Sequence, residues 1–193
     1  MRSERTSDAS LSRRPSVRRV VLLALLLLCD CAGADFTALE RAVRDVEVEL
    51  DARVGVVVRE IGSTERWAHR ESERFLLNSS VKALICAAML ARVDAGAMTL
   101  EETLPVAEAD LIAHAPLTER RVGQDVAVGE LCRAAVDLSD NTAANLLITR
   151  LGGPSAVTAF LRGTGDAHTR LDRMEPELNR WAEGDPRDTT TPE

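Results

Sequence analysis

Apolar residues recur every three or four positions in several stretches of the chain, which is the spacing of one face of an α-helix. Proline suits the first turn of a helix, and glycine suits the position just after the last turn. These signals predict five helices, at residues 36–50, 79–94, 128–138 and 141–151 and from Pro154 to the closing glycines Gly163 and Gly165. Residues 111–118, around Pro116, are predicted to be mostly loop.

A β-hairpin is predicted between the first two helices. Residues 53–60 are rich in valine, Gly62-Ser63 forms a turn, and residues 65–69 make a second strand. No clear strand pattern follows, and from Asp166 onward the chain is polar and proline-rich, which indicates a long functional loop or a disordered tail. The pattern therefore predicts an α+β chain, in which a helix and a hairpin from an incomplete antiparallel sheet precede a helical domain.

The first 34 residues differ in kind from the rest. Six arginines precede a short apolar run, Val20 to Leu28, and the small residues Ala32-Gly33-Ala34 follow. This pattern predicts a secretory signal peptide cleaved after Ala34, because the apolar run is too short to span a bilayer. Ser12-Arg13-Arg14 also fits a twin-arginine signal, so the export route stays open between that and general secretion. We expect an exported domain of residues 35–193, periplasmic or secreted. Lipid anchoring at Cys29 or Cys31 is less favoured, because neither follows a small residue.

Composition narrows the function classes. Hydrophobic residues make up 45% of the chain, which supports a packed core. Removing the leader would take the formal net charge from −7 to −10, which argues against a nucleic-acid partner. The three histidines, His69, His114 and His168, have no metal-ligand spacing, so we predict no metal and no other cofactor.

Two cysteines remain after the leader is removed, Cys86 and Cys132. Export to an oxidising compartment favours a disulfide between them. The alternative is a pair of buried free thiols, which is common for cysteines within helices.

Lys82 is the only lysine in the chain, and it follows Ser79 by three positions. Arginine keeps its proton in proteins, whereas a desolvated lysine amine can lose one and act as a base. Positions i and i+3 share a helix face, so the Ser79 hydroxyl and the Lys82 amine can touch. That pairing is typical of an activated serine nucleophile, although a solvated surface lysine is the commoner case.

Two further motifs carry candidate chemistry. Ser139-Asp140-Asn141 lies between two predicted helices, where it could present a hydroxyl and an amide to a cleft or simply cap the second helix. Glu175 and Asn179 could hold a water between carboxylate and amide, although most charge-rich segments are solvated loops.

The motifs Ser79-x-x-Lys82, Ser139-Asp140-Asn141 and Glu175-Pro176-Glu177-Leu178-Asn179, in this order and spacing, resemble those of class A serine β-lactamases. The resemblance runs from Phe36 to Glu193, and supporting segments include Thr142-Ala143-Ala144-Asn145-Leu146-Leu147. It implies an α+β fold of the α/β-sandwich type.

The resemblance implies a role for each matching residue. Ser79 would attack the β-lactam ring, Lys82 or Glu175 would be the base for that step, and Ser139 would pass a proton to the leaving nitrogen. Glu175 with Asn179 would then activate the water that releases the product. Asn141, Asn179 and His114 would contact the substrate, with His114 at the cleft edge. Cys86 and Cys132 match a disulfide, and Arg173 and Asp188 match an ion pair that closes the loop carrying Glu175.

Departures from the family pattern are also visible. Asn78 is unusual before the serine, and no Lys-Thr-Gly element is present, since Lys82 is the only lysine. In the family that element supplies an oxyanion-hole donor and a carboxylate clamp, so we expect a truncated chain that is unstable and nearly inactive alone. We expect a monomer that takes a small β-lactam. The alternatives are a penicillin-binding peptidase, which would lack the Glu175–Asn179 pair, and an inactive exported fragment that binds β-lactams.

Overall fold

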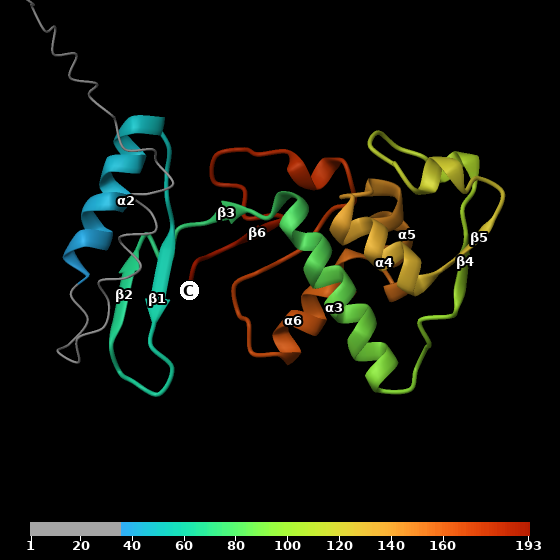
Figure 1. Cartoon of the computed structure of the whole chain (residues 1–193), viewed down its shortest axis with the longest axis horizontal. Helices are drawn as coiled ribbons and strands as arrows, with labels where there is room; N and C mark the ends of the chain where they lie inside the picture. Colours follow the sequence, from blue (N-terminus) through green and yellow to red (C-terminus); the bar gives the residue numbers. More distant parts are fainter. Residues whose placement is uncertain (1–35) are drawn as a thin grey trace, which may run out of the picture.

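The computed structural model describes residues 36–193, so the predicted signal peptide lies outside the described residues. Helix α2 (Thr37–Leu50) packs with a hairpin of β1 (Val56–Arg59) and β2 (Arg66–His69). The hairpin is antiparallel, with Val56 opposite His69 and Arg59 opposite Arg66. The expected helix and hairpin are confirmed, and Figure 1 shows them together on one side of the molecule.

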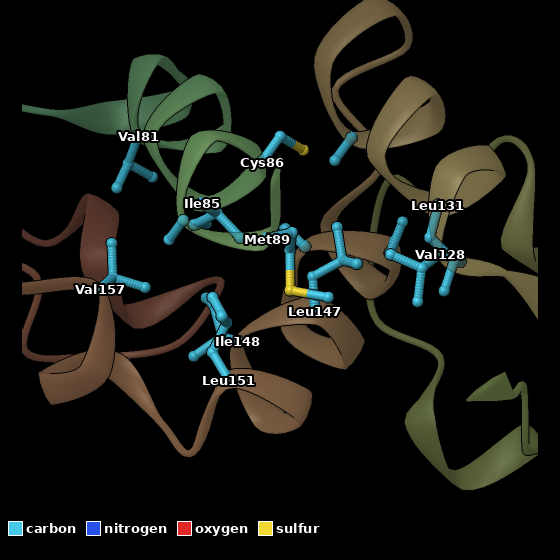
Figure 2. Packing of buried hydrophobic residues seen from close by; sticks show 14 of the residues in the cluster. Val81, Ile85, Cys86, Met89, Val128, Leu131, Leu147, Ile148, Leu151 and Val157 are labelled. Carbon is cyan, nitrogen blue, oxygen red and sulfur yellow. The ribbon is translucent and has the colours of Figure 1, made fainter. Parts of the chain in front are cut away.

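The other four predicted helices form a second body on the other side of the molecule (Figure 1). They are α3 (Val81–Asp94), α4 (Val128–Asp137), α5 (Asn141–Leu151) and α6 (Pro154–Gly163). Helix α3 is apolar on nearly every side, so it is buried among the other three. Figure 2 shows its residues Val81, Ile85 and Met89 pointing into the core. The α+β fold is therefore confirmed.

Two pairs of short strands lie outside the hairpin, so the expectation of no further strands was wrong. β3 (Phe75–Leu76) pairs with β6 (Thr189–Thr190), and β4 (Thr103–Pro105) pairs with β5 (Asp125–Ala127). Strands of two or three residues are too short to show an alternating pattern in the sequence. The β3–β6 pair also brings the polar C-terminal segment back beside the start of α3, so that segment is a long loop in contact with the helical body.

Four short 3₁₀ turns complete the described elements. They are η1 (Asn78–Ser80), η2 (Glu108–Asp110), η3 (Thr118–Arg120) and η4 (Glu177–Asn179). No helix within residues 36–193 combines the length and the apolar character needed to cross a membrane.

The hairpin meets the rest of the chain at Gly55. A β-carbon at this position would lie 2.5 Å from Cε2 of Phe75 and 2.6 Å from Cγ of Pro192, so only glycine fits. Arg53 adds a cation–π contact, with its guanidinium carbon 5.0 Å from the centroid of the Phe75 ring. Because residue 55 carries no side chain, its backbone packs directly against Phe75 and Pro192. This close contact attaches the hairpin to the β3–β6 region.

Glu47 joins α2 to the hairpin. Its carboxylate accepts hydrogen bonds from the backbone N–H of Val54 at 2.9 Å and from Nε of Arg70 at 2.7 Å, and it lies 3.1 Å from Nε2 of His69. The hydrogen bond from Arg70 is the main reason that the pKa of Glu47 falls from 4.5 to about 2. One carboxylate therefore contacts both ends of the hairpin.

Replacing Glu47 with glutamine should remove a pH-dependent part of the stability. Because the folded pKa lies below the unfolded one, the carboxylate stabilises the fold fully above pH 4.5, and this contribution is lost as the pH falls toward 2. Urea unfolding should show Glu47→Gln less stable than the parent at pH 7, with the difference shrinking below pH 4.5. Glu49→Gln, an exposed change on the same helix, is the matched control. A difference that is the same at pH 7 and pH 3 would contradict this account.

Candidate active site

Ser79 and Lys82 lie at the junction between η1 and α3. Ser79 is exposed on the 3₁₀ turn, and Lys82 is buried in the first turn of the helix. The Nζ of Lys82 is 3.4 Å from Oγ of Ser79, so the three-residue spacing brings amine and hydroxyl together. Asn78 adopts a φ of 46°, a left-handed conformation that asparagine tolerates better than most residues. This backbone requirement accounts for the unusual Asn78.

Within the Ser139-Asp140-Asn141 motif, the middle residue makes different contacts from its two neighbours. Asp140 is fully buried and caps α5 by accepting the Ala143 N–H at 2.8 Å. It also accepts the N–H groups of Leu117 and Thr118, both at 3.0 Å. The capping interpretation therefore applies to Asp140, while its neighbours Ser139 and Asn141 face Lys82.

The Lys82 amine is surrounded by oxygen atoms from this motif. It donates to the backbone carbonyl of Ser139 at 2.8 Å and to Oδ1 of Asn141 at 2.5 Å. It also lies 3.0 Å from Oγ of Ser139, and that hydroxyl lies 3.0 Å from Oγ of Ser79. The three groups form a closed set through which a proton can pass between Ser79, Lys82 and Ser139.

Glu175 completes the surroundings of Lys82. Its side chain is fully buried, and Oε1 is 3.3 Å from the Lys82 Nζ. The other oxygen, Oε2, accepts a hydrogen bond from Nδ2 of Asn179 at 2.6 Å. Apart from the ion pair with Lys82, the buried Oε1 accepts no hydrogen bond from the residues that the structure describes, so a lone pair of this oxygen is available to accept a proton.

Asn145 also fixes Glu175, although its role is not predicted from the sequence. Its Oδ1 accepts the Glu175 N–H at 2.9 Å, and its Nδ2 donates to the Glu175 carbonyl at 3.0 Å. The only available signal was an asparagine one helical turn after Asn141 in a segment that matched the family. Its reach of 30 residues along the chain could not be predicted from local spacing.

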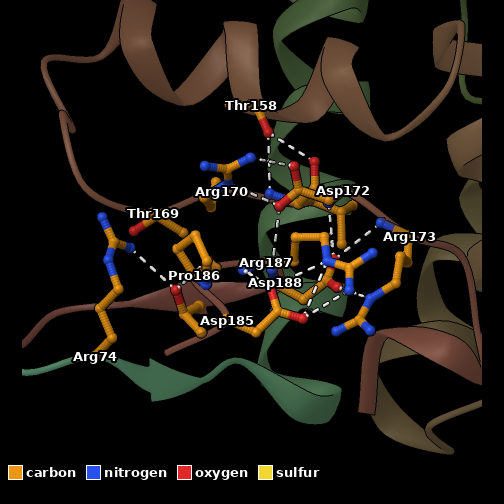
Figure 3. Close-up of polar contacts among 12 residues, drawn as sticks. Arg74, Thr158, Thr169, Arg170, Asp172, Arg173, Asp185, Pro186, Arg187 and Asp188 are labelled. Atoms are coloured by element: carbon orange, nitrogen blue, oxygen red, sulfur yellow. Dashed lines mark hydrogen bonds and ion pairs between the residues drawn. The ribbon is translucent and has the colours of Figure 1, made fainter. Parts of the chain in front are cut away.

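Asp188 anchors the loop that carries Glu175 (Figure 3). The fully buried carboxylate forms an ion pair with Arg173 and accepts the N–H groups of Asp172 and Arg173 at 2.8 and 2.9 Å. The carbonyl of Asp188 accepts the N–H of Leu77 at 2.9 Å. The same residue therefore closes the loop and attaches it to the segment just before Ser79.

His114 lies beside the Ser139 motif. Its carbonyl accepts the Asn141 N–H at 3.0 Å, and the neighbouring carbonyl of Ala113 accepts Nδ2 of Asn141 at 2.8 Å. The His114 residue is exposed.

The predicted disulfide is not formed in the structure, where Cys86 and Cys132 are both free thiols. The Cys86 thiol points at the neighbouring helix, with its Sγ 3.5 Å from the Cys132 carbonyl. The hydrogen bond with Cys132, together with burial, raises the pKa of the Cys86 thiol well above its ordinary value. The two cysteines are therefore adjacent but reduced.

Metal-binding groups do not gather anywhere in the described part of the chain. Within residues 36–193, no three His, Cys, Asp or Glu side chains are grouped so that they could hold a metal ion.

Comparison with known proteins points to one family. Residues 38–193 match the family model described as the β-lactamase enzyme family. The chain is 55% identical to a β-lactamase of Rhodobacter capsulatus over 155 residues, which cover 80% of this chain and 53% of that protein. It is 50% identical to the β-lactamase L2 of Stenotrophomonas maltophilia over 161 residues, which cover 83% of this chain and 51% of that one. The chain thus spans about half the length of these relatives.

Solved structures agree with the sequence matches. A β-lactamase from Xanthomonas campestris pv. campestris superposes with a TM-score of 0.77 at 44% identity, covering 80% of this chain and 58% of that one. An ancestral class A β-lactamase superposes with a TM-score of 0.75 at 52% identity, covering 79% and 58%.

Replacing Asp188 with asparagine should loosen the loop of residues 170–188. Arg173 would lose the buried counter-ion that it contacts, so we expect the free energy of unfolding to fall by roughly 3 kcal/mol. Asp185→Asn is the matched control, because its partner Arg187 is half-exposed and such ion pairs contribute little. Urea unfolding measures the loss, and limited proteolysis should cut between residues 170 and 188 only in Asp188→Asn. Equal stability of the two variants would contradict the anchoring role of Asp188.

Proposed function

The chain belongs to the β-lactamase enzyme family, and from this premise we propose that it opens β-lactam rings through an acyl-enzyme on Ser79. One observation carries the proposal. The hydroxyls of Ser79 and Ser139 and the carboxylate of Glu175 all lie within 3.4 Å of the Lys82 amine. A buried amine in contact with a nucleophile, a proton donor and a carboxylate can serve both steps of an acyl transfer.

In the first step Ser79 Oγ attacks the lactam carbonyl. Lys82 accepts the hydroxyl proton after passing one of its own to Glu175, whose Oε1 lies 3.3 Å from the amine. The C–N bond of the ring then breaks, and the nitrogen takes the proton of Ser139, which is replaced from Lys82. This route uses both candidate bases, with Lys82 in direct contact with Ser79 and Glu175 holding the displaced proton.

The second step is hydrolysis of the ester on Ser79. The proton held by Glu175 returns to Lys82, so the carboxylate is free to take a proton from water. The hydroxide attacks the ester carbon, and Ser79 Oγ leaves and regains a proton through Lys82. Asn179 holds Oε2 of Glu175 at 2.6 Å, which leaves Oε1 to face the water and the amine. The orientation of the carboxylate thus supports its role as general base.

Asn141 is the residue that we assign to the substrate side chain. Its Oδ1 contacts Lys82, and one N–H of its amide donates to the Ala113 carbonyl. A primary amide has a second N–H, which can donate to a carbonyl on the substrate. Asn179 is assigned to the same substrate cleft, with His114 at its edge.

The wider setting follows from the family and from the leader. We assign residues 1–34 to a signal peptide and the remainder to a monomer in the periplasm or outside the cell. In such a compartment the adjacent thiols of Cys86 and Cys132 would oxidise to a disulfide. This link would join α3, which carries Lys82, to α4, which leads into Ser139.

Glu175→Gln should trap the acyl-enzyme. Glutamine cannot accept a proton from Lys82 or from water, so with labelled penicillin the adduct on Ser79 should form more slowly than in the parent and, once formed, should persist at least 100-fold longer. Mass spectrometry of the Ser79 peptide over time measures the adduct. Ser79→Ala should take up no label, and Glu177→Gln, an exposed change in the same loop, should release it at the parent rate. Absence of any adduct on the parent chain would overturn the proposed function, and rapid release from Glu175→Gln would overturn the role of Glu175.

The disulfide can be tested separately from catalysis. When the chain is exported to an oxidising compartment and digested without reductant, we expect a peptide in which Cys86 and Cys132 are linked. Neither cysteine of the exported chain should react with an alkylating reagent. The link would close a loop of 46 residues and stabilise the fold by about 4 kcal/mol relative to the reduced chain. Cys132→Ser is the control that cannot form it. Ready alkylation of both thiols in the exported chain would contradict the disulfide.

A further inference from the structure

Two loops, at residues 113–114 and 138–141, are joined by three hydrogen bonds beside the candidate active site. Residues 113–114 offer their two carbonyls to the backbone and side-chain N–H groups of Asn141. In the opposite direction, Nε2 of the His114 ring lies 3.0 Å from the carbonyl of Leu138. The third bond is the only one of these that depends on the identity of a side chain in the 113–114 loop.

The chemistry of this contact defines its direction. A backbone carbonyl can only accept, so Nε2 of His114 must carry the proton and donate it. Nε2 keeps that proton both in the corresponding neutral tautomer and in the imidazolium form. The bond therefore needs an N–H at the Nε2 position and does not need an aromatic ring as such.

Leu138 directly precedes Ser139, where the backbone is under constraint. Ser139 adopts a φ of 57° and His114 a φ of 64°, both in the left-handed region that residues other than glycine rarely adopt. Such conformations persist only when surrounding contacts enforce them. Ser139 also offers both its carbonyl and its hydroxyl to Lys82, so a small rotation of its peptide would disturb two contacts of the amine.

We propose that His114 is a positioning residue, which holds the Leu138 carbonyl and thereby keeps Ser139 turned toward Lys82 and Ser79. This differs from a role of the ring as an apolar wall against the substrate. The inference rests on the proposed function for its catalytic consequence, but the positioning itself can be measured without any substrate.

Two substitutions separate the alternatives. His114→Phe keeps an aromatic ring and loses the donor, whereas His114→Gln loses the ring and keeps an N–H donor at about the distance of Nε2. His168→Phe is the matched control, since it removes another partly exposed histidine, whose ring lies 3.9 Å from Glu193 and outside the contacts of Lys82. His114→Ala replaces the phenylalanine variant if that variant does not fold.

Because Lys82 is the only lysine in the sequence, an NMR signal from labelled lysine reports on the surroundings of its amine. Lysine labelled with ¹³C at Cε gives one NMR signal, from Lys82. We expect this signal to shift in His114→Phe and to keep its parent position in His114→Gln and His168→Phe. Acylation of Ser79 by labelled penicillin should slow about tenfold in His114→Phe, the equivalent of one hydrogen bond, and recover in His114→Gln.

The reverse pattern would overturn the inference. If His114→Phe leaves both the Lys82 signal and the acylation rate unchanged while His114→Gln slows acylation, the ring acts as a wall and not as a donor. If the parent chain forms no adduct but the Lys82 signal responds as expected, the proposed function fails while the positioning role of His114 stands.

Discussion

The burial of one ammonium group constrains the whole helical body. A lysine amine removed from water must be surrounded by acceptors, because an unpaired buried charge is very costly. The amine of Lys82 has its acceptors on three separate segments: η1, the α4–α5 junction and the loop that carries Glu175. These segments can meet only when α3, α4 and α5 are packed against one another. The assembly of the site and the packing of the core are therefore the same event.

A second layer of contacts keeps the loop of Glu175 in place. Asn145 holds the backbone of Glu175 itself, and Asp188 holds the two ends of the loop through Arg173 and the neighbouring amides. The Asp188 carbonyl also contacts Leu77, two residues before Ser79. The loop that carries Glu175 and the segment just before Ser79 are thus both held by Asp188. This arrangement explains how a loop that contains only the short 3₁₀ turn η4 can hold a group within 3.3 Å of the Lys82 amine.

The fold could be predicted where local pattern and tertiary packing agree. The helices around Val43, Met89 and Leu147 have an apolar face or an apolar run long enough to be recognised, and the valine-rich hairpin has a clear turn. The strands at Phe75 and Thr189 could not be recognised, because two-residue strands carry no period and their partners lie more than 100 positions away in the sequence. The disulfide expected from two cysteines and an export signal is likewise absent from the structure, although the two thiols are neighbours.

By itself the sequence determined the pairing of Ser79 with Lys82, because a three-residue spacing at a helix start is a local geometric fact. It also determined which motifs accompany that pair, and hence the family. Only the tertiary structure decided that Asp140 binds neighbouring backbone N–H groups while Ser139 and Asn141 face the amine. It also decided that Asn145 holds the backbone of Glu175 and that His114 contacts the Leu138 carbonyl. These assignments depend on contacts between residues 22 to 59 positions apart in the sequence. Such contacts are set by how the helices pack, and no local spacing in the sequence records them.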